Sequence, residues 1–208
     1  MPANMVQFCP IVRAGQVKAM TFQQIKQTLK HRLSARRFEH SVGVSETAVQ
    51  LAERHGGDVE KARLAGLLHD CAREMPRNTL LHTAQSFGIV MGSIERRELA
   101  LLHAPIGARL AQTIYGITDP EIIAAIAAHT VGGPNLGQLS VIVYLADYIE
   151  PTRSFPGVDK LRSLAQTNLA AAMIESYDHS IQYIISRGGL IHPATVEGRN
   201  ELLLQRDN

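Results

Sequence analysis

The stretch from Ala65 to Arg73 constrains this 208-residue chain more than any other, because an apolar helical run ends there in an adjacent His69-Asp70 pair. Apolar residues lie on nearly every side of the predicted helix, so the helix belongs in a protein core. A buried carboxylate is costly unless a metal ion or hydrogen bonds satisfy it. An imidazole and a carboxylate that emerge together from a rigid helix are common metal ligands. We therefore expect a core built around a metal site at this pair.

Helical signals continue on both sides of this stretch. A capping-box pattern begins at Thr21, and a second helix is predicted from about Ala35 to His55, where Gly56-Gly57 end it. Asp58 is the expected cap of the third helix, which carries the central stretch and ends before Pro76. Further helices are predicted over residues 78–88, 94–102, 105–116, 120–128 and 139–149, in two segments from an Asp159 cap to Arg187, and over 195–205. Strand signals are weak, so the predicted fold class is all-α.

Length and composition fit a single globular domain. A hydrophobic fraction of 45% and a charged fraction of 19% are ordinary for a folded protein, and the length suits one core. Residues 1–20 contain prolines and a glycine but no clear periodicity, and they lack the pattern of a secretory signal. We predict a loosely ordered leader over residues 1–20 and one helical domain over residues 21–208.

Charge and cysteine content exclude several classes of partner. The net charge of +2 is too small to predict binding to nucleic acid or to an anionic membrane. No uncharged apolar run reaches about 18 residues, which argues against a transmembrane helix. Cys9 and Cys71 are the only cysteines, and their contexts make a disulfide a poor prediction, so a reducing cytoplasm fits best. The near-neutral charge and helical surfaces leave a homodimer open.

Other candidate ligands lie on both sides of the central pair, each near a predicted helix end or on a buried helix. The full set is His40, His69, Asp70, His103, His129 and Asp147. Imidazole and carboxylate ligands together suit Fe, Mn, Zn or Co and suit Ca poorly. Four ligands could hold one ion, and six could hold two, with Asp70 as the bridge. The remaining histidines are read as packed or surface residues: His31, His55, His82, His179 and His192.

Phosphate-binding groups accompany these ligands. Arg73 and Arg153 each lie a few residues beyond a ligand, and guanidinium groups suit polyphosphate oxygens. Most helix arginines are nevertheless simply solvated. The loop after His129 offers the Thr130 hydroxyl and the backbone N–H groups near Gly132. The sequence therefore predicts Arg73, Thr130, Gly132 and Arg153 as substrate contacts.

The ligand order and its surroundings resemble a known family. The order His…His-Asp…Asp is similar to the HD-domain superfamily of metal-dependent phosphohydrolases, with His69-Asp70 as the adjacent pair. Over roughly residues 24–203 the chain resembles, more narrowly, the YqeK-type symmetrical bis(5'-nucleosyl)-tetraphosphatases. The stretches that carry this resemblance are Arg37 to Val44, Gly66 to Asp70, Leu102 to Ala108, Ala128 to Gly132 and Ala146 to Pro151. Mild departures are Arg73, where a lysine is common, and Val131, where a threonine is frequent.

The resemblance implies an HD-type helical bundle with a dinuclear site in its core, occupied by iron or alternatively by Mn, Co or Zn. It also implies that the six residues above are the ligands and that diadenosine tetraphosphate is cleaved into two ADP molecules. Asp70, His103 and His129 are then the catalytic residues. The expected mechanism is attack by a metal-bridging hydroxide on a phosphorus of the tetraphosphate. The nucleotide partner is a dinucleoside polyphosphate or an ADP- or GDP-like nucleotide.

Two other readings remain open from the sequence. One is an HD hydrolase of another nucleotide, such as a cyclic dinucleotide or guanosine tetraphosphate. The Gly-Tyr-Pro signature of cyclic di-GMP hydrolases is absent after His129, and so is the synthetase domain usual in long alarmone enzymes. The other is a metal-stabilised nucleotide-binding module without turnover, against which the presence of all six ligands argues.

Overall fold

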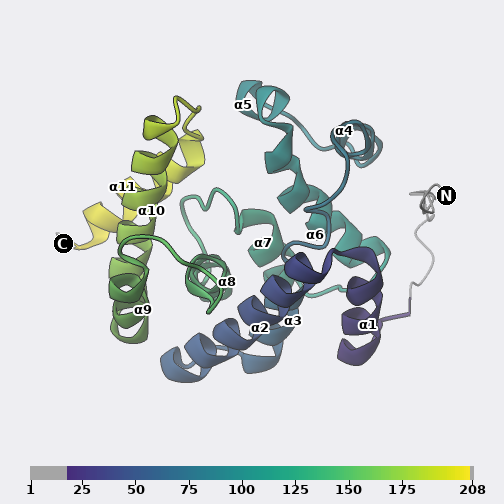
Figure 1. Cartoon of the computed structure of the whole chain (residues 1–208), viewed down its shortest axis with the longest axis horizontal. Helices are drawn as coiled ribbons and strands as arrows, with labels where there is room; N and C mark the ends of the chain where they lie inside the picture. The colour runs from purple at the N-terminus through teal and green to yellow at the C-terminus, as the bar shows by residue number, and fades with distance from the viewer. Residues whose placement is uncertain (1–17, 207–208) are drawn as a thin grey trace.

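A computed structural model of the chain describes residues 18–206, and this part is helical with no strand (Figure 1). The elements are α1 (Phe22–Arg32), α2 (Ala35–His55), α3 (Val59–Leu68), α4 (Arg77–Ser86), α5 (Ser93–Arg97), the 3-10 helix η1 (Leu99–Leu102), α6 (His103–Thr113), α7 (Pro120–Ala128), α8 (Gln138–Ile149), α9 (Val158–Thr167), α10 (Leu169–Ser186) and α11 (Pro193–Arg206). The all-α prediction is confirmed. Most of the predicted leader lies outside the described residues, but the backbone N–H of Met20 donates to the Tyr115 carbonyl at 3.1 Å.

Several helices begin or end at the residues that the local sequence predicts. The Thr21 side chain and the Gln24 side chain form the predicted capping box of α1. Gly56 ends α2 with a positive φ of 70°, a conformation that glycine adopts without steric cost. Asp119 caps α7 and Pro120 is its first residue, which satisfies the free N–H groups of that turn. These three boundaries confirm the expectation from sequence.

Three boundaries differ from the expectation. α3 ends at Leu68, and residues 69–74 form consecutive turns in which the N–H of Cys71 reaches back three residues to the Leu68 carbonyl. The predicted 94–102 helix is divided at Glu98, whose ψ of 67° is not helical. Asp159 lies in the first turn of α9, and Gly157 takes the cap position in its place.

Two apolar clusters lie on either side of the layer formed by α2, α3 and α8. One includes Leu67, Leu68 and Ile126, and the other includes Leu51 and Leu145, all fully buried. Figure 1 shows α9, α10 and α11 on one side of the molecule and α1, α4 and α6 on the other, with α7 and α8 between them. The candidate ligands lie where this central layer meets α6 and α7, so the core itself positions the site.

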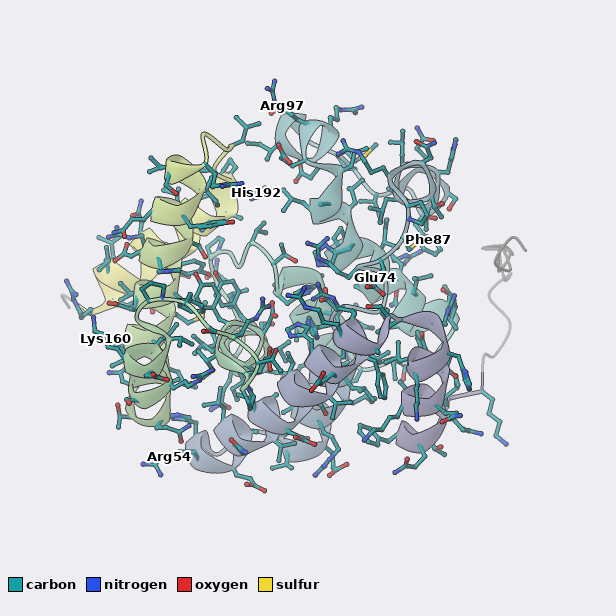
Figure 2. The ribbon with its side chains drawn as sticks, viewed as in Figure 1. Arg54, Glu74, Phe87, Arg97, Lys160 and His192 are labelled. Carbon is teal, nitrogen blue, oxygen red and sulfur yellow. The ribbon has the colours of Figure 1, made fainter. Side chains whose placement is uncertain are left out.

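The start of α2 is tied to the turns that follow α3. The backbone N–H and hydroxyl of Ser34 donate to the two carboxylate oxygens of Glu74 at 2.7 and 2.6 Å, and Glu74 is labelled in Figure 2. Ser34 in turn caps α2 by accepting from the Arg37 N–H. These contacts set the first turns of α2, which carry His40, against the segment that carries His69-Asp70. None of the helices in the described part of the chain is long and apolar enough to cross a bilayer.

Candidate metal centre

Six side chains that the sequence singled out converge from five places in the fold. His40 lies in α2, Asp147 lies near the end of α8, and His103 is the first residue of α6. His69-Asp70 and His129 each follow directly after a helix, α3 and α7 respectively. The four histidines and Asp70 are buried, and the Asp147 side chain is 19% exposed. The site is therefore an inner pocket, in which the Asp147 side chain is the most exposed of the six.

The two oxygens of Asp70 divide the cluster into two groups. Oδ2 lies 3.7 Å from the His40 Nε2 and 3.5 Å from the His69 Nε2. Oδ1 lies 3.2 Å from the His103 Nε2 and 3.5 Å from the His129 Nε2. Asp147 joins the first group, with its Oδ1 3.0 Å from the His40 Nε2. We call the set His40, His69 and Asp147 the inner triad, and the set His103 and His129 the imidazole pair.

Backbone carbonyls fix the ring orientation of three histidines. The Nδ1 atoms of His69 and His129 lie 2.7 Å from the carbonyl oxygens of Gly66 and Ile126, and His103 makes the same contact with Ala100. A carbonyl oxygen only accepts, so this network assigns the proton to Nδ1 and leaves a lone pair on Nε2. The histidine at a helix end thus uses one of the free carbonyls of its own last turn.

Lone pairs therefore face one another in the centre of the cluster. The Nε2 atoms of His40 and His69 are 3.2 Å apart, and those of His103 and His129 are 3.0 Å apart. Such distances match the edge of a coordination polyhedron whose ligands lie about 2.1 Å from a metal ion. A cation between acceptors held this close would stabilise them. The residues fit transition-metal ions. Either of two groups that share His69, namely His40–His69–Asp147 and His69–Asp70–His129, could hold one ion.

The electrostatics of the centre favour positive charge. Burial raises the pKa of the Asp70 carboxyl, but His69, His103 and His129 outweigh it and hold that pKa well below its usual value. Burial acts in the same sense on Asp147, and contacts with His40, His69 and Arg153 keep its pKa low. Burial also lowers the pKa of His103, and Asp70 only partly opposes this. The carboxylates are thus charged, and the His103 imidazole favours its neutral, ligating form.

Two arginines contact the carboxylates from outside. Arg37 donates to the Asp70 Oδ2 at 2.6 Å, and Arg153 donates to the Asp147 carboxylate and, at 2.8 Å, to its backbone carbonyl. Both line the cavity above the centre, together with Arg73. The predicted contacts Arg73 and Arg153 are therefore next to the ligands, and Arg37 joins them as a stronger partner of Asp70 than the sequence indicated.

The loop after His129 faces the site through the Thr130 hydroxyl rather than through backbone N–H groups. The Thr130 Oγ1 lies 3.1 Å from the Nε2 atoms of both His103 and His129. The N–H of Gly132 donates to the Ala128 carbonyl, and the N–H of Gly133 donates to the Tyr177 hydroxyl. Gly132 does not line the cavity, and its Cα lies against the Tyr177 ring. These N–H groups are used within the protein, so the phosphate-binding role predicted for Gly132 gains no support.

A cavity of about 500 Å³ opens above the centre. Its inner surface includes Asp70, His103, His129 and the arginines, and its outer wall is formed by His179, Ser180, Tyr183 and Ile184 of α10, with Tyr148 and Phe155 beside them. The Tyr148 hydroxyl lies 2.7 Å from the His179 Nδ1, and the Phe155 and His179 rings are 4.6 Å apart. No local sequence signal marks His179 as a cavity residue, because it lies in the middle of a helix among residues of mixed character. His179 is packed against Tyr148 and Phe155, within the expectation of a packed or surface residue, and it also lines the cavity.

Comparison with known proteins agrees with this geometry. Residues 37–152 match the family model described as "HD domain". The chain is 37% identical to the symmetrical bis(5'-nucleosyl)-tetraphosphatase of Halalkalibacterium halodurans, over 86% of this chain and 96% of that protein. It is 36% identical to the enzyme of the same name from Bacillus subtilis, over 85% of this chain and 94% of that protein. A crystal structure of a predicted HD superfamily hydrolase involved in NAD metabolism, from Clostridium acetobutylicum, superposes with a TM-score of 0.88 at 40% identity, covering 90% of this chain and 100% of that one.

Proposed function

The chain belongs to the HD-domain family and, within it, to the symmetrical bis(5'-nucleosyl)-tetraphosphatases, and from that premise we propose that it hydrolyses diadenosine tetraphosphate to two ADP molecules. The observation that carries this proposal is the division of ligands by the two oxygens of Asp70. A carboxylate shared in this way is suited to two ions that act on one phosphate. The inner triad, the imidazole pair and Asp70 would be the ligands.

Iron is our proposed occupant, with Mn, Co and Zn as the alternatives. The donors are imidazole nitrogens and carboxylate oxygens, which suit all four metals and not Ca. When bound, such ions activate water for attack at phosphorus and neutralise charge on the phosphates. The free, buried Cys71 fits a reducing cytoplasmic setting.

The chain's own residues would bind and orient the tetraphosphate. Arg37, Arg73 and Arg153 line the cavity beside the ligands, and their guanidinium groups can hold phosphate oxygens at the point of cleavage. The Thr130 hydroxyl beside the imidazole pair can donate to the same phosphate. Charge that develops on the ADP leaving group is then met by fixed positive groups, which stabilises the transition state.

The outer wall of the cavity would hold a nucleoside. Tyr148, Phe155 and His179 place three aromatic rings within 6 Å of one another, as centroid distances of 5.4, 5.9 and 4.6 Å indicate. Purine bases stack on such rings. An ADP unit with its terminal phosphate near Asp70 and its base against this wall would place the central phosphate bridge at the ligands.

The test is hydrolysis of diadenosine tetraphosphate by protein loaded anaerobically with Fe or Mn, with the products separated by chromatography. We expect ADP as the sole nucleotide product and no turnover after chelation. A mixture of ATP and AMP would contradict the symmetrical cut but keep the metal-dependent hydrolase. Bound metal without any cleavage would contradict the proposed substrate.

A further inference from the structure

One of the four histidines in the centre is held differently from the others. His69, His103 and His129 direct Nδ1 at a backbone carbonyl three residues earlier in the chain. His40 directs its Nδ1 at a carboxylate oxygen of Glu150, 3.0 Å away and 110 residues later. The local turn therefore orients three rings, whereas a distant buried charge orients the fourth.

Glu150 is built into its position. Glu150 is fully buried and lies directly after α8, the helix that carries Asp147. Its carboxylate also accepts from the Thr152 hydroxyl and, at 2.7 Å, from the Thr152 N–H. A Cβ at position 43 would lie 2.9 Å from the Glu150 Oε2, so only glycine leaves the carboxylate room one turn after His40. Thr152 and Gly43 thus help to keep this negative charge behind the His40 ring.

The charge makes the two ligand groups unequal. A carboxylate that accepts a hydrogen bond from Nδ1–H draws the proton toward itself. It thereby makes the Nε2 lone pair a stronger metal ligand than a neutral carbonyl acceptor would. The inner triad has Asp147 and Glu150 in addition to a share of Asp70. Arg153 pairs with Asp147 and lies 3.9 Å from the Glu150 carboxylate, and Arg37 pairs with the Asp70 oxygen on this side, so the arginines offset part of this charge. The imidazole pair has its share of Asp70 alone, and carbonyl oxygens lie behind both rings.

We propose that Glu150 is a positioning residue that orders metal loading, so that the first ion occupies the inner triad and the second occupies the imidazole pair with lower affinity. This inference rests on the proposed dinuclear site. Outer carboxylates of this kind commonly change metal affinity by about 10- to 100-fold. An ion held early by the inner triad and Asp70 would also align the second oxygen of Asp70 for the other ion.

The experiment is a titration of the metal-free full chain with Mn²⁺, followed by calorimetry and by electron paramagnetic resonance. We expect wild type to take up two ions in two steps, with an isolated Mn²⁺ signal after the first equivalent and a coupled signal after the second. Glu150→Gln keeps the shape but removes the charge, and it should weaken the first step by about 10- to 100-fold. The two steps then merge and the coupled signal appears before one equivalent is reached.

Two further variants separate charge from position. Gly43→Ala retains the Glu150 charge but displaces the carboxylate, and it should weaken the first step to a smaller extent. Glu39→Gln removes an exposed carboxylate beside His40 and should bind both ions as wild type does. Circular dichroism verifies folding, and Gly43→Ala carries the test if Glu150→Gln does not fold. An unchanged first step in both Glu150→Gln and Gly43→Ala, or equal steps in wild type, would overturn the inference. A wild-type protein that binds one ion only would overturn the dinuclear proposal together with it.

Discussion

The floor of the cavity and its α10 wall differ in burial and in what holds their side chains. On the floor, Asp70, His103 and His129 are buried, and each of the two histidine rings has a backbone carbonyl as its acceptor. On the wall, Tyr183 is 61% exposed, and His179 is held by other cavity side chains, through a hydrogen bond to Tyr148 and a ring contact with Phe155. The floor is thus a buried polar cluster oriented by the backbone, whereas the wall is more exposed and is held by contacts between side chains.

The same division appears in the family match. The HD-domain model covers residues 37–152, which include all six candidate ligands and Arg37, whereas Arg153 follows one residue after its end. It ends before α9, so the α10 wall lies outside it. We infer that the part matched by the HD-domain model carries the phosphate chemistry and that the C-terminal helices determine nucleoside specificity. The predictions below test this division, from the strongest expected effect to the weakest.

Asp70→Asn should abolish activity. The amide keeps the shape of the carboxylate but cannot bridge two ions with two anionic oxygens, so we expect hydrolysis to fall by at least about a thousandfold and bound metal to decrease. Metal analysis and a product assay on the same preparation test this. Near-normal turnover by a folded Asp70→Asn protein would show that the catalytic centre does not lie on the cavity floor.

Arg73→Gln should weaken substrate binding on the floor without loss of metal. Arg73 is exposed at the cavity, and a lost charge-assisted contact to phosphate corresponds to an increase in KM of about tenfold. Steady-state kinetics measure it. The matched control is Arg77→Gln, at an exposed arginine four residues later that does not line the cavity. Its KM should stay at the wild-type value.

His179→Ala should affect the wall alone. Loss of its ring and of the Tyr148 contact should weaken inhibition by ADP about fivefold or more, since stacking on one base contributes about 1–3 kcal/mol. Inhibition by pyrophosphate, which has no base, should stay unchanged, as should metal content. His82→Ala, at an exposed position in α4, is the control. Equal losses for ADP and pyrophosphate would mean that the wall and the floor do not divide these tasks.

Glu95→Gln should have the smallest effect, on stability. The Glu95 carboxylate accepts from His192 at 2.9 Å and so joins α5 to the segment before α11, where Figure 2 labels His192. Burial raises the pKa of Glu95, but His192 outweighs it and the pKa lies below the usual 4.5. The link therefore stabilises the fold above about pH 4.5, and the stabilisation is lost as the pH falls through the lower folded value.

Urea unfolding measures that effect. We expect Glu95→Gln to lower the free energy of unfolding by about 0.5–1 kcal/mol at pH 7 and by less at pH 3. Glu98→Gln, at an exposed position three residues later, should change it at neither pH. A larger loss at pH 3 than at pH 7 would contradict the sign derived from the pKa of Glu95.

The candidate ligands could be predicted from the sequence because the signals that mark them are local. Each ligand lies in or next to a helix whose cap or apolar face is visible in the chain, as with Asp119-Pro120 before His129. Glu150 could not be assigned a role, because its partner His40 is 110 residues away and only folding brings them together. The end of α3 at Leu68 was missed for another reason. Apolar residues continue beyond it, and the turns there depend on contacts such as that between Glu74 and Ser34.

The contact between α10 and the loop after His129 limits which positions of the wall can change during evolution. Tyr177 is fully buried, its hydroxyl accepts from the Gly133 N–H, and its ring lies against Gly132. Two turns later on the same helix, Tyr183 is exposed and borders the cavity. Relatives that act on different nucleotides can therefore diverge at position 183 at little cost. At position 177 a new side chain would require a compensating change in the glycine loop, so we expect those sites to vary as a pair.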